Sequence, residues 1–291
     1  GTAMVLVGTK SQGQGHETLY KQIVNERLGL DPKDVKFIDG DTDRVAFGMG
    51  TNGSRSTVIG GGAAWTAADR IIEKGRKIAA HVLEASVEDV EFKAGQFSVR
   101  GTDKTLSLKE VAKTSFVLNK LPPGLEGGLF ETATYAPKAE TWPNGSHACE
   151  VEIDPGTGEV QVVGYWVVDD VGTMINPVGV KGQIHGGVAQ GLGQALMERV
   201  VYDPDSGQLL TGSLMDYAVP RADLAQAFFK TEMDEGTPSI NNVLGVKGVG
   251  ELGTIGATPA VVNAVADALA RNGHAKVTRH LQMPLTPERV W

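Results

Sequence analysis

The stretch GVKGVGELGTIG, residues 245–256, is the most informative part of this sequence. It holds five glycines, one lysine and one carboxylate. Thr258 and Pro259 follow it, and these residue types are favoured at the N-cap and in the first turn of a helix. Residues 259–271 are almost all apolar, so we expect a helix there that is buried on all sides. The stretch therefore presents Glu251 on permissive backbone at the edge of a core.

Glu251 has two interpretations. Glycines are used where the backbone must adopt a positive φ or let a ligand approach closely, and a carboxylate fixed in such a turn can act as a general base. The alternative is an ordinary surface glutamate in a glycine-rich turn. Residues 245–256 considered alone favour the alternative.

Glycine is abundant along the whole chain: 38 of 291 residues, or about 13% against the usual ~7%. The rest of the composition is that of a folded globular protein, since 41% of the residues are hydrophobic. The chain is long enough for two lobes. A net charge of −8 without a basic run argues against nucleic acid or an anionic membrane surface as partner.

Cys149 is the single cysteine, which excludes an internal disulfide and an iron–sulfur cluster held by this chain alone. No apolar run approaches the ~20 residues of a membrane span, and no signal peptide is recognisable. We therefore expect a cytoplasmic protein without a membrane span. Residues 1–8 read as the middle of a strand, which indicates a fragment or one subunit of a larger protein.

A first glycine-rich loop, Gln12-Gly13-Gln14-Gly15-His16, lies between a predicted strand at residues 4–7 and a predicted helix that ends at Gly29. Such a turn directs several backbone N–H groups toward one point at a helix N-terminus. The loop lacks the third glycine of the dinucleotide motif, and its glutamines favour a ligand rich in heteroatoms. For His16 alone, capping of its own turn is the simpler interpretation.

A second loop, residues 48–57, ends in Gly53-Ser54-Arg55-Ser56-Thr57 and precedes a predicted helix over residues 63–85. The hydroxyls of Ser54, Ser56 and Thr57 can donate to phosphate oxygens, and Arg55 can bind a phosphate bidentately. The alternative is a flexible polar loop without a ligand. Because the first 60 residues contain two such loops, this alternative is less favoured.

The second half of the chain is predicted to be rich in strands. We place a linker at residues 121–128, between a first cofactor-binding lobe at residues 1–120 and a second lobe at residues 129–291. Strands are expected at residues 130–135, 147–153, 159–168 and 227–233, and the middle two form a hairpin. The predicted fold class is α+β, with two mixed α/β lobes.

A predicted helix over residues 181–197 carries five glycines, each costing about 1 kcal/mol relative to alanine. This cost favours a close approach of the backbone to a neighbour or a ligand. Gln183 and Gln190 lie seven residues apart and share one face of the helix, where they could bind a buried polar ligand. The alternative is helix–helix packing with surface amides.

Taken together, these segments resemble the molybdenum-binding large subunit of the xanthine dehydrogenase, aldehyde oxidase and carbon monoxide dehydrogenase family. Each motif is weak alone, but all occur in the family's order from one end of the chain to the other. The resemblance covers the C-terminal part of such a subunit. The motifs are Gly13-Gln14-Gly15-His16, Gly53-Ser54-Arg55-Ser56-Thr57, Asn176-Pro177, Gly182-Gln183-Ile184-His185-Gly186-Gly187 with Gln190-Gly191, and Gly248-Val249-Gly250-Glu251.

The resemblance implies a molybdopterin cofactor that carries molybdenum, in bacteria usually as the cytosine dinucleotide. It implies that Gln190 lies near the metal, that Glu251 is the catalytic glutamate, and that no residue of this chain ligates the metal. The residues that would line the cofactor are Gln12, Gly13, Gln14, Gly15, His16, Thr51, Gly53, Ser54, Arg55, Ser56, Thr57, Gln183, Lys247, Gly248, Val249 and Gly250.

The reaction implied by the resemblance is hydroxylation of a small molecule with water as the oxygen source and Glu251 as the base. The surroundings of Glu251 and Gln190 are more similar to the relatives that oxidise aldehydes or N-heterocycles than to carbon monoxide dehydrogenase proper, which stays an alternative. The implied partners are the N-terminal part of the molybdenum subunit, an iron–sulfur subunit with [2Fe–2S] clusters and an FAD subunit, in a hetero-oligomer.

Two other functions were weighed. A catalytically inert excised or assembly domain that binds no cofactor alone stays open. A nicotinamide-dependent Rossmann dehydrogenase is excluded, because its motif and its alternation of strands and helices are missing.

Overall fold

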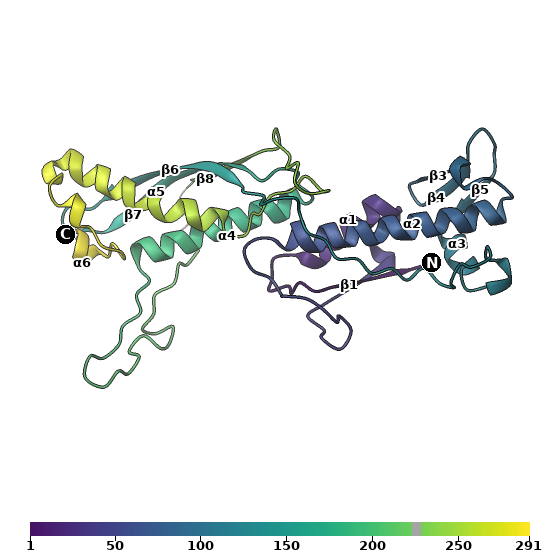
Figure 1. The fold of residues 1–291 in the computed structure, drawn as a ribbon. Helices are drawn as coiled ribbons and strands as arrows, with labels where there is room; N and C mark the ends of the chain where they lie inside the picture. Colours follow the sequence, from purple (N-terminus) through teal and green to yellow (C-terminus); the bar gives the residue numbers. More distant parts are fainter. Residues whose placement is uncertain (223–227) are drawn as a thin grey trace. The chain divides into compact units, whose positions relative to one another are not determined.

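The computed structural model describes residues 1–222 and 228–291 (Figure 1). The chain forms two compact units. Unit 1 comprises Gly1–Thr141 and Ser239–Val246, and unit 2 comprises Trp142–Pro238 and Lys247–Trp291. Each unit mixes helices with a small sheet, which confirms the α+β prediction.

The division between the units comes later than the linker predicted at residues 121–128. Leu121 is buried, and Leu125 and Leu129 pack against the core of unit 1, so the predicted linker belongs to the first unit. The short return segment 239–246 is held there by hydrogen bonds such as that from Lys138 N–H to the Asn241 carbonyl, 2.9 Å. The composition of a linker does not reveal such contacts.

Unit 1 contains a β–α–β unit and a long helix that carries a small antiparallel sheet. β1 and β2 pair in parallel, with Val5 opposite Phe37, and β3, β4 and β5 pair antiparallel in that order. A π-helical turn at Thr57–Gly61 precedes α2. The elements are β1 Ala3–Val7, α1 His16–Leu28, β2 Val35–Asp39, α2 Gly62–Val82, β3 Val90–Lys93, β4 Gln96–Val99, β5 Thr105–Ser107 and α3 Leu108–Thr114.

Local sequence signals set several boundaries in unit 1. Gly29 ends α1 in the left-handed region, at φ 67°, and its N–H donates to the Asn25 carbonyl, 2.8 Å. Ser107 and Glu110 form a capping box at the start of α3, in the order of residue types that is typical of this motif. The core joins α1, α2 and the small sheet, and it includes the fully buried Phe97.

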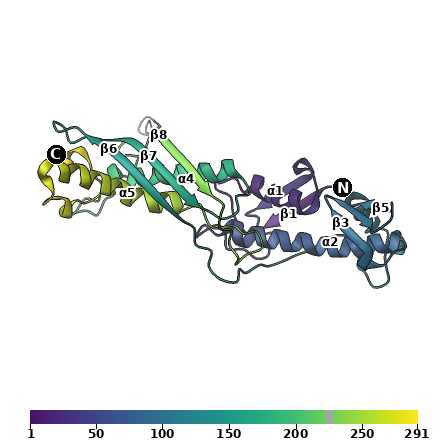
Figure 2. The same cartoon turned by 90° about the horizontal axis from the view of Figure 1, so that it is seen from above.

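Unit 2 consists of a three-stranded sheet with two helices packed on it (Figure 2). β7 is the central strand, antiparallel to β6 and parallel to β8. Tyr165 and Val167 of β7 form the core with Ile184 and Val188 of α4 and with Val261 of α5. The elements are β6 Asn144–Ile153, β7 Val160–Asp170, α4 Pro177–Leu196, β8 Phe228–Asp234, α5 Leu252–Leu269 and α6 Pro287–Val290.

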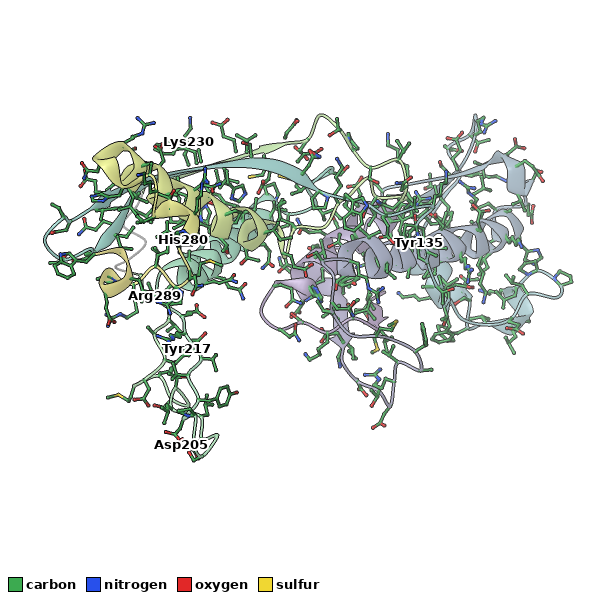
Figure 3. All side chains as sticks on the ribbon, turned by 60° about the vertical axis from the view of Figure 1, so that its left-hand side comes forward. Tyr135, Asp205, Tyr217, Lys230, His280 and Arg289 are labelled. Atoms are coloured by element: carbon green, nitrogen blue, oxygen red, sulfur yellow. The ribbon has the colours of Figure 1, made fainter. Side chains whose placement is uncertain are left out.

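A long arm, residues 198–222, leaves unit 2 after α4. Figure 3 shows Asp205 near the far end of this arm and Tyr217 nearer its base. The Tyr217 hydroxyl donates to Glu198 Oε2, 2.6 Å, while Leu214 and Met215 are almost fully exposed. The arm is therefore held at its base and presents apolar side chains farther out.

One predicted strand is absent from the structure, and another is confirmed with a shifted end. Residues 130–135 form no strand, because the segment is held on α2 by other contacts: the Thr132 carbonyl accepts from Arg70, and the Tyr135 ring lies against Gly62. The strand predicted at residues 227–233 is β8, Phe228–Asp234. Residue 227 lies outside the described residues.

α5 begins at Leu252, seven residues before the predicted start, and contains Pro259 in its interior. The Thr258 hydroxyl, predicted to cap the helix, donates to the Thr254 carbonyl instead, 3.4 Å. The early turn forms because Gly253 packs directly on α4, with the Ile184 carbonyl 2.5 Å from the position of a Cβ. This packing outweighs the local capping signal.

α5 is buried along one stripe rather than on all sides. Gly253, Ala257, Val261 and Val265 are buried, whereas Ile255 is 67% exposed. By length and composition alone, the helical stretch Leu252–His274 could also cross a membrane, contrary to the expectation of no such apolar run. The core helix of a soluble protein can have the same length and composition.

Candidate functional site

The two glycine-rich loops of unit 1 are joined by hydrogen bonds. Thr51 makes two of them: its hydroxyl donates to the Lys10 carbonyl, 2.7 Å, and accepts from the Lys10 N–H, 3.2 Å. The Gly50 N–H donates to the Gly8 carbonyl, 3.1 Å. The segment that leads into residues 12–16 is thus hydrogen-bonded to the start of the loop at residues 51–57.

Tyr20 lies beneath both loops. Its hydroxyl donates to the Ser56 carbonyl, 3.2 Å, and lies 3.0 Å from Thr9 Oγ1. Burial raises the pKa of Tyr20 to about 12, so the hydroxyl stays protonated near neutral pH. A side chain at Gly60 would collide with this hydroxyl. Tyr20 was not predicted from the sequence, although it lies in the helix predicted to end at Gly29.

Four glycines at the surface of these loops adopt backbone conformations that other residues rarely adopt. Gly13, Gly15, Gly50 and Gly53 have φ values of 112°, 80°, 67° and 60°, and a Cβ at any of them would meet no atom within 4 Å. Positive φ therefore explains these glycines in this chain, and the space above their backbone is open. A ligand can approach the main chain there.

His16 follows the first loop and is 3% exposed. Its Nδ1 is buried and has no hydrogen-bond partner among the described residues. Burial lowers the pKa of His16, while Asp39 raises it and Lys10 lowers it further, so the ring is neutral at pH 7. A buried ring nitrogen without a partner is costly, and it is suited to a hydrogen bond with a ligand.

The glutamines and the arginine of these loops make contacts within unit 1. Gln14 Oε1 accepts from the Gln12 N–H, 2.5 Å, and Gln14 Nε2 donates to the Lys10 carbonyl, 3.2 Å. The Arg55 guanidinium lies 3.5 Å from the sulfur of Met49. These side chains stabilise the loop conformations, and their role toward a ligand stays a prediction.

In unit 2, glycines of α4 allow close contact with α5. A Cβ at Gly187 would lie 2.8 Å from the Thr254 nitrogen, and one at Gly191 would lie 2.6 Å from the Ala257 Cβ. Gly182 and Gly186, by contrast, have no atom within 4 Å of that position. The sequence predicted that the backbone of this helix approaches a neighbour or a ligand closely. At Gly187 and Gly191 that neighbour is α5.

Gln183 and Gln190 lie on the stripe of α4 that contains Gly187, beside α5. Gln183 is half-buried and Gln190 is exposed. The pair thus flanks the first turns of α5, where Glu251 stands at the N-cap position. The Glu251 side chain is exposed and does not cap its own helix.

Two aspartates at the end of β7, neither of them predicted from the sequence, connect to the segment that carries Glu251: Asp170 directly, and Asp169 through His147. Asp170 Oδ2 is 2.5 Å from Lys247 Nζ, four residues before Glu251. Asp169, fully buried, is 3.3 Å from His147 Nε2, and the His147 ring lies against Gly256, five residues after Glu251. The sequence signal was the pair of acidic residues ending an apolar strand.

The predicted site residues are thus divided between the units. Residues 12–16 and 51–57 belong to unit 1, while Gln183, Gln190 and residues 247–251 belong to unit 2. In unit 1 the segment before residues 12–16 is hydrogen-bonded to Gly50 and Thr51, and in unit 2 Gln183 and Gln190 lie on α4, which packs against the helix that begins after Glu251.

Residues 1–225 match the family model described as "Molybdopterin cofactor-binding domain". Over its whole length the chain is 40% identical to 35% of the carbon monoxide dehydrogenase large chain of Hydrogenophaga pseudoflava. It is equally 40% identical to 35% of the nicotine 6-hydroxylase large subunit of Paenarthrobacter nicotinovorans. The structure of CO dehydrogenase from Oligotropha carboxidovorans matches 99% of this chain and 35% of its own, with a TM-score of 0.90 and 39% identity. The chain thus spans little more than a third of these relatives.

Proposed function

This chain belongs to the molybdopterin cofactor-binding domain family, and from that premise we propose that it is the C-terminal portion of the cofactor-binding subunit of a molybdenum hydroxylase. Its proposed substrate is an aldehyde, an N-heterocycle or a related small molecule, and water is the oxygen source. The proposed cofactor form is the cytosine dinucleotide, and the proposed location is the cytoplasm. The proposed partners are the N-terminal part of the subunit, an iron–sulfur subunit with [2Fe–2S] clusters and an FAD subunit.

The observation that carries this proposal is the joined pair of loops in unit 1, because its chemistry suits the cofactor. Open backbone above four glycines, the unpartnered Nδ1 of His16 and the hydroxyls of residues 51–57 suit a ligand made of amide-like rings and phosphates. The proposed lining from unit 1 is residues 12–16, Thr51 and residues 53–57. From unit 2 it is Gln183 and residues 247–250.

When bound, the cofactor supplies two-electron redox chemistry and activates water. Glu251 is the proposed general base, which takes the proton from the water-derived nucleophile. Gln190 is proposed to lie near the metal when the cofactor is bound.

Glu251→Gln tests this role. We expect turnover to fall by roughly 10²–10⁴-fold, the typical contribution of a general base, while the molybdenum content measured by elemental analysis stays that of the wild type. Glu159→Gln, which changes an exposed glutamate at the start of β7, is the control. Normal turnover of a molybdenum-loaded Glu251→Gln enzyme would exclude Glu251 as the base.

Carbon monoxide dehydrogenase proper is a second candidate, because a relative that shares 40% identity with the chain has that name. A substrate screen should therefore include carbon monoxide beside aldehydes and N-heterocycles. Absence of molybdenum from the protein purified with its partners would instead favour the inert domain.

A further inference from the structure

We propose that Asp170 and Lys247 are positioning residues for Glu251: their buried ion pair fixes the Glu251 loop, residues 245–256, to the end of β7. This inference rests on the proposed role of Glu251. It assigns the side chain of Lys247 to the ion pair, so the cofactor contact proposed above for Lys247 falls to its main chain. Neither residue is a catalytic residue in this proposal, since both act through the backbone that carries Glu251.

Asp170 is the centre of the attachment. Its Oδ2 accepts from Lys247 Nζ, 2.5 Å, from the Thr237 hydroxyl and from Asn144 Nδ2, 3.3 Å. Its Oδ1 accepts from the Gly172 N–H, 2.9 Å. Burial alone would raise the pKa of Asp170, but the hydrogen bonds from Lys247, Thr237 and Gly172 outweigh it and lower that pKa. The carboxylate is therefore ionised and held on both oxygens.

Lys247 uses both of its donor groups within unit 2. Its ammonium is paired with Asp170 and lies 3.4 Å from the Thr237 hydroxyl, and its backbone N–H donates to the Val171 carbonyl, 2.8 Å. The side chains of Lys247 and Asp170 are only 12% and 10% exposed. Lys247 is thus fixed at side chain and main chain, four residues before Glu251.

On the other side of Glu251, the loop is contacted by His147 of β6, which in turn lies close to two residues of β7. His147 Nδ1 is 2.8 Å from the Tyr165 hydroxyl, its Nε2 is 3.3 Å from Asp169 Oδ1, and its ring is 2.5 Å from the position of a Cβ on Gly256. Glu251 is therefore bracketed by a direct attachment to Asp170 of β7 and by a contact with His147 of the paired strand β6. Between them lie Gly248, Gly250 and Gly253, whose permissive backbone does not fix a conformation by itself.

The inference explains why a buried ion pair stands here. A buried ion pair adds little to the free energy of unfolding, because the cost of desolvating both charges offsets most of their attraction. Loss of one partner is nevertheless destabilising, because it leaves the other charge buried and uncompensated. The pair therefore selects one loop conformation against others. A general base must be held within hydrogen-bond reach of the proton that it takes, and the β7 attachment supplies that constraint.

Hydrogen exchange of residues 245–256 tests the positioning, in the protein purified with its native partners. We expect exchange on the order of tenfold faster or more in Asp170→Asn and in Lys247→Met, with wild-type exchange in α1. Lys247→Arg, which keeps the charge, should restore most of the protection. Asp267→Asn is the control, because Asp267 pairs with Arg271 on the exposed surface of α5, 2.7 Å away.

Kinetics give the second measurement. We expect kcat to fall about tenfold or more in Asp170→Asn and Lys247→Met, with KM and molybdenum content close to the wild type. The double variant should be no worse than either single variant, since the two residues act as one unit. If Asp170→Asn does not fold, Thr237→Val removes one donor to the same carboxylate and should produce a smaller increase in exchange.

Unchanged exchange in Lys247→Met, or additive losses in the double variant, would overturn the inference. Loss of molybdenum from Lys247→Met without faster exchange of the loop would also overturn it, and would make Lys247 a cofactor ligand. Failure of the proposed function is distinguishable: an active Glu251→Gln enzyme would refute the role of Glu251, whereas the exchange result does not depend on turnover.

Discussion

Replacing Gly187 by alanine tests the helix contact on which the Glu251 loop rests. A Cβ at Gly187 would lie 2.8 Å from the Thr254 nitrogen, 2.9 Å from the Gly253 Cα and 3.1 Å from the Gly253 carbonyl carbon. All three are main-chain atoms of the first turn of α5, so none can rotate away. α5 must shift from α4 to admit the methyl group.

Two effects of opposite sign set the magnitude. Alanine is favoured over glycine inside a helix by about 1 kcal/mol, whereas overpacking a close contact costs about 1–3 kcal/mol. Because the obstructing atoms belong to the backbone, we take the upper end of the overpacking cost, about 3 kcal/mol. Subtracting the gain of about 1 kcal/mol from alanine leaves a net loss of stability of about 2 kcal/mol. Gly186→Ala is the matched control: no atom lies within 4 Å of its Cβ position, so it should gain about 1 kcal/mol.

The assay is thermal unfolding of the two variants under identical conditions. A difference of about 3 kcal/mol corresponds to roughly 6–12 °C between their melting temperatures for a domain of this size class. Gly187→Ala should also reduce turnover, because the shift of α5 moves Glu251. The reasoning would be refuted if Gly187→Ala melted at or above the temperature of Gly186→Ala.

Two further predictions concern unit 1. Ser107→Ala removes the side chain that accepts from the Glu110 N–H, 3.2 Å, in the capping box of α3; it should lower stability by about 1 kcal/mol, and an unchanged urea midpoint would contradict this. His16 has a pKa lowered by burial below its ordinary value of 6.5, so the unfolded state binds the proton more readily than the folded state. Its contribution is present above pH 6.5 and is lost as the pH falls through the folded pKa. Hydrogen exchange of residues 12–16 should therefore rise in the wild type between pH 7 and pH 5 after correction for intrinsic rates, but not in His16→Asn, and equal profiles would contradict the assignment.

Several elements could be predicted because their causes are local. Gly29 ends α1, Ser107 and Glu110 start α3, and the turn at residues 154–158 joins β6 to β7. Each depends on a few adjacent residues whose conformational preferences are strong. The motifs with their order along the chain likewise led to the family that the comparisons show.

Other features depended on residues far apart in the sequence. The start of α5 followed from packing against α4, and the assignment of residues 121–128 and 239–246 to unit 1 followed from contacts with its core. The extended segment 130–135 has the composition of a strand but pairs with none in the described part of the chain.

The sequence by itself determined that glycine-rich loops precede the helices, that α4 has a glycine-lined face and that Glu251 stands in such a loop, because these are properties of neighbouring residues. Only the tertiary structure decided which of these groups meet. Thr51 with Lys10, Tyr20 with Ser56, and Lys247 with Asp170 are brought together from distant positions in the chain. The physical reason is that such contacts follow from burial and from the pairing of polar groups in a packed unit, which no local pattern records.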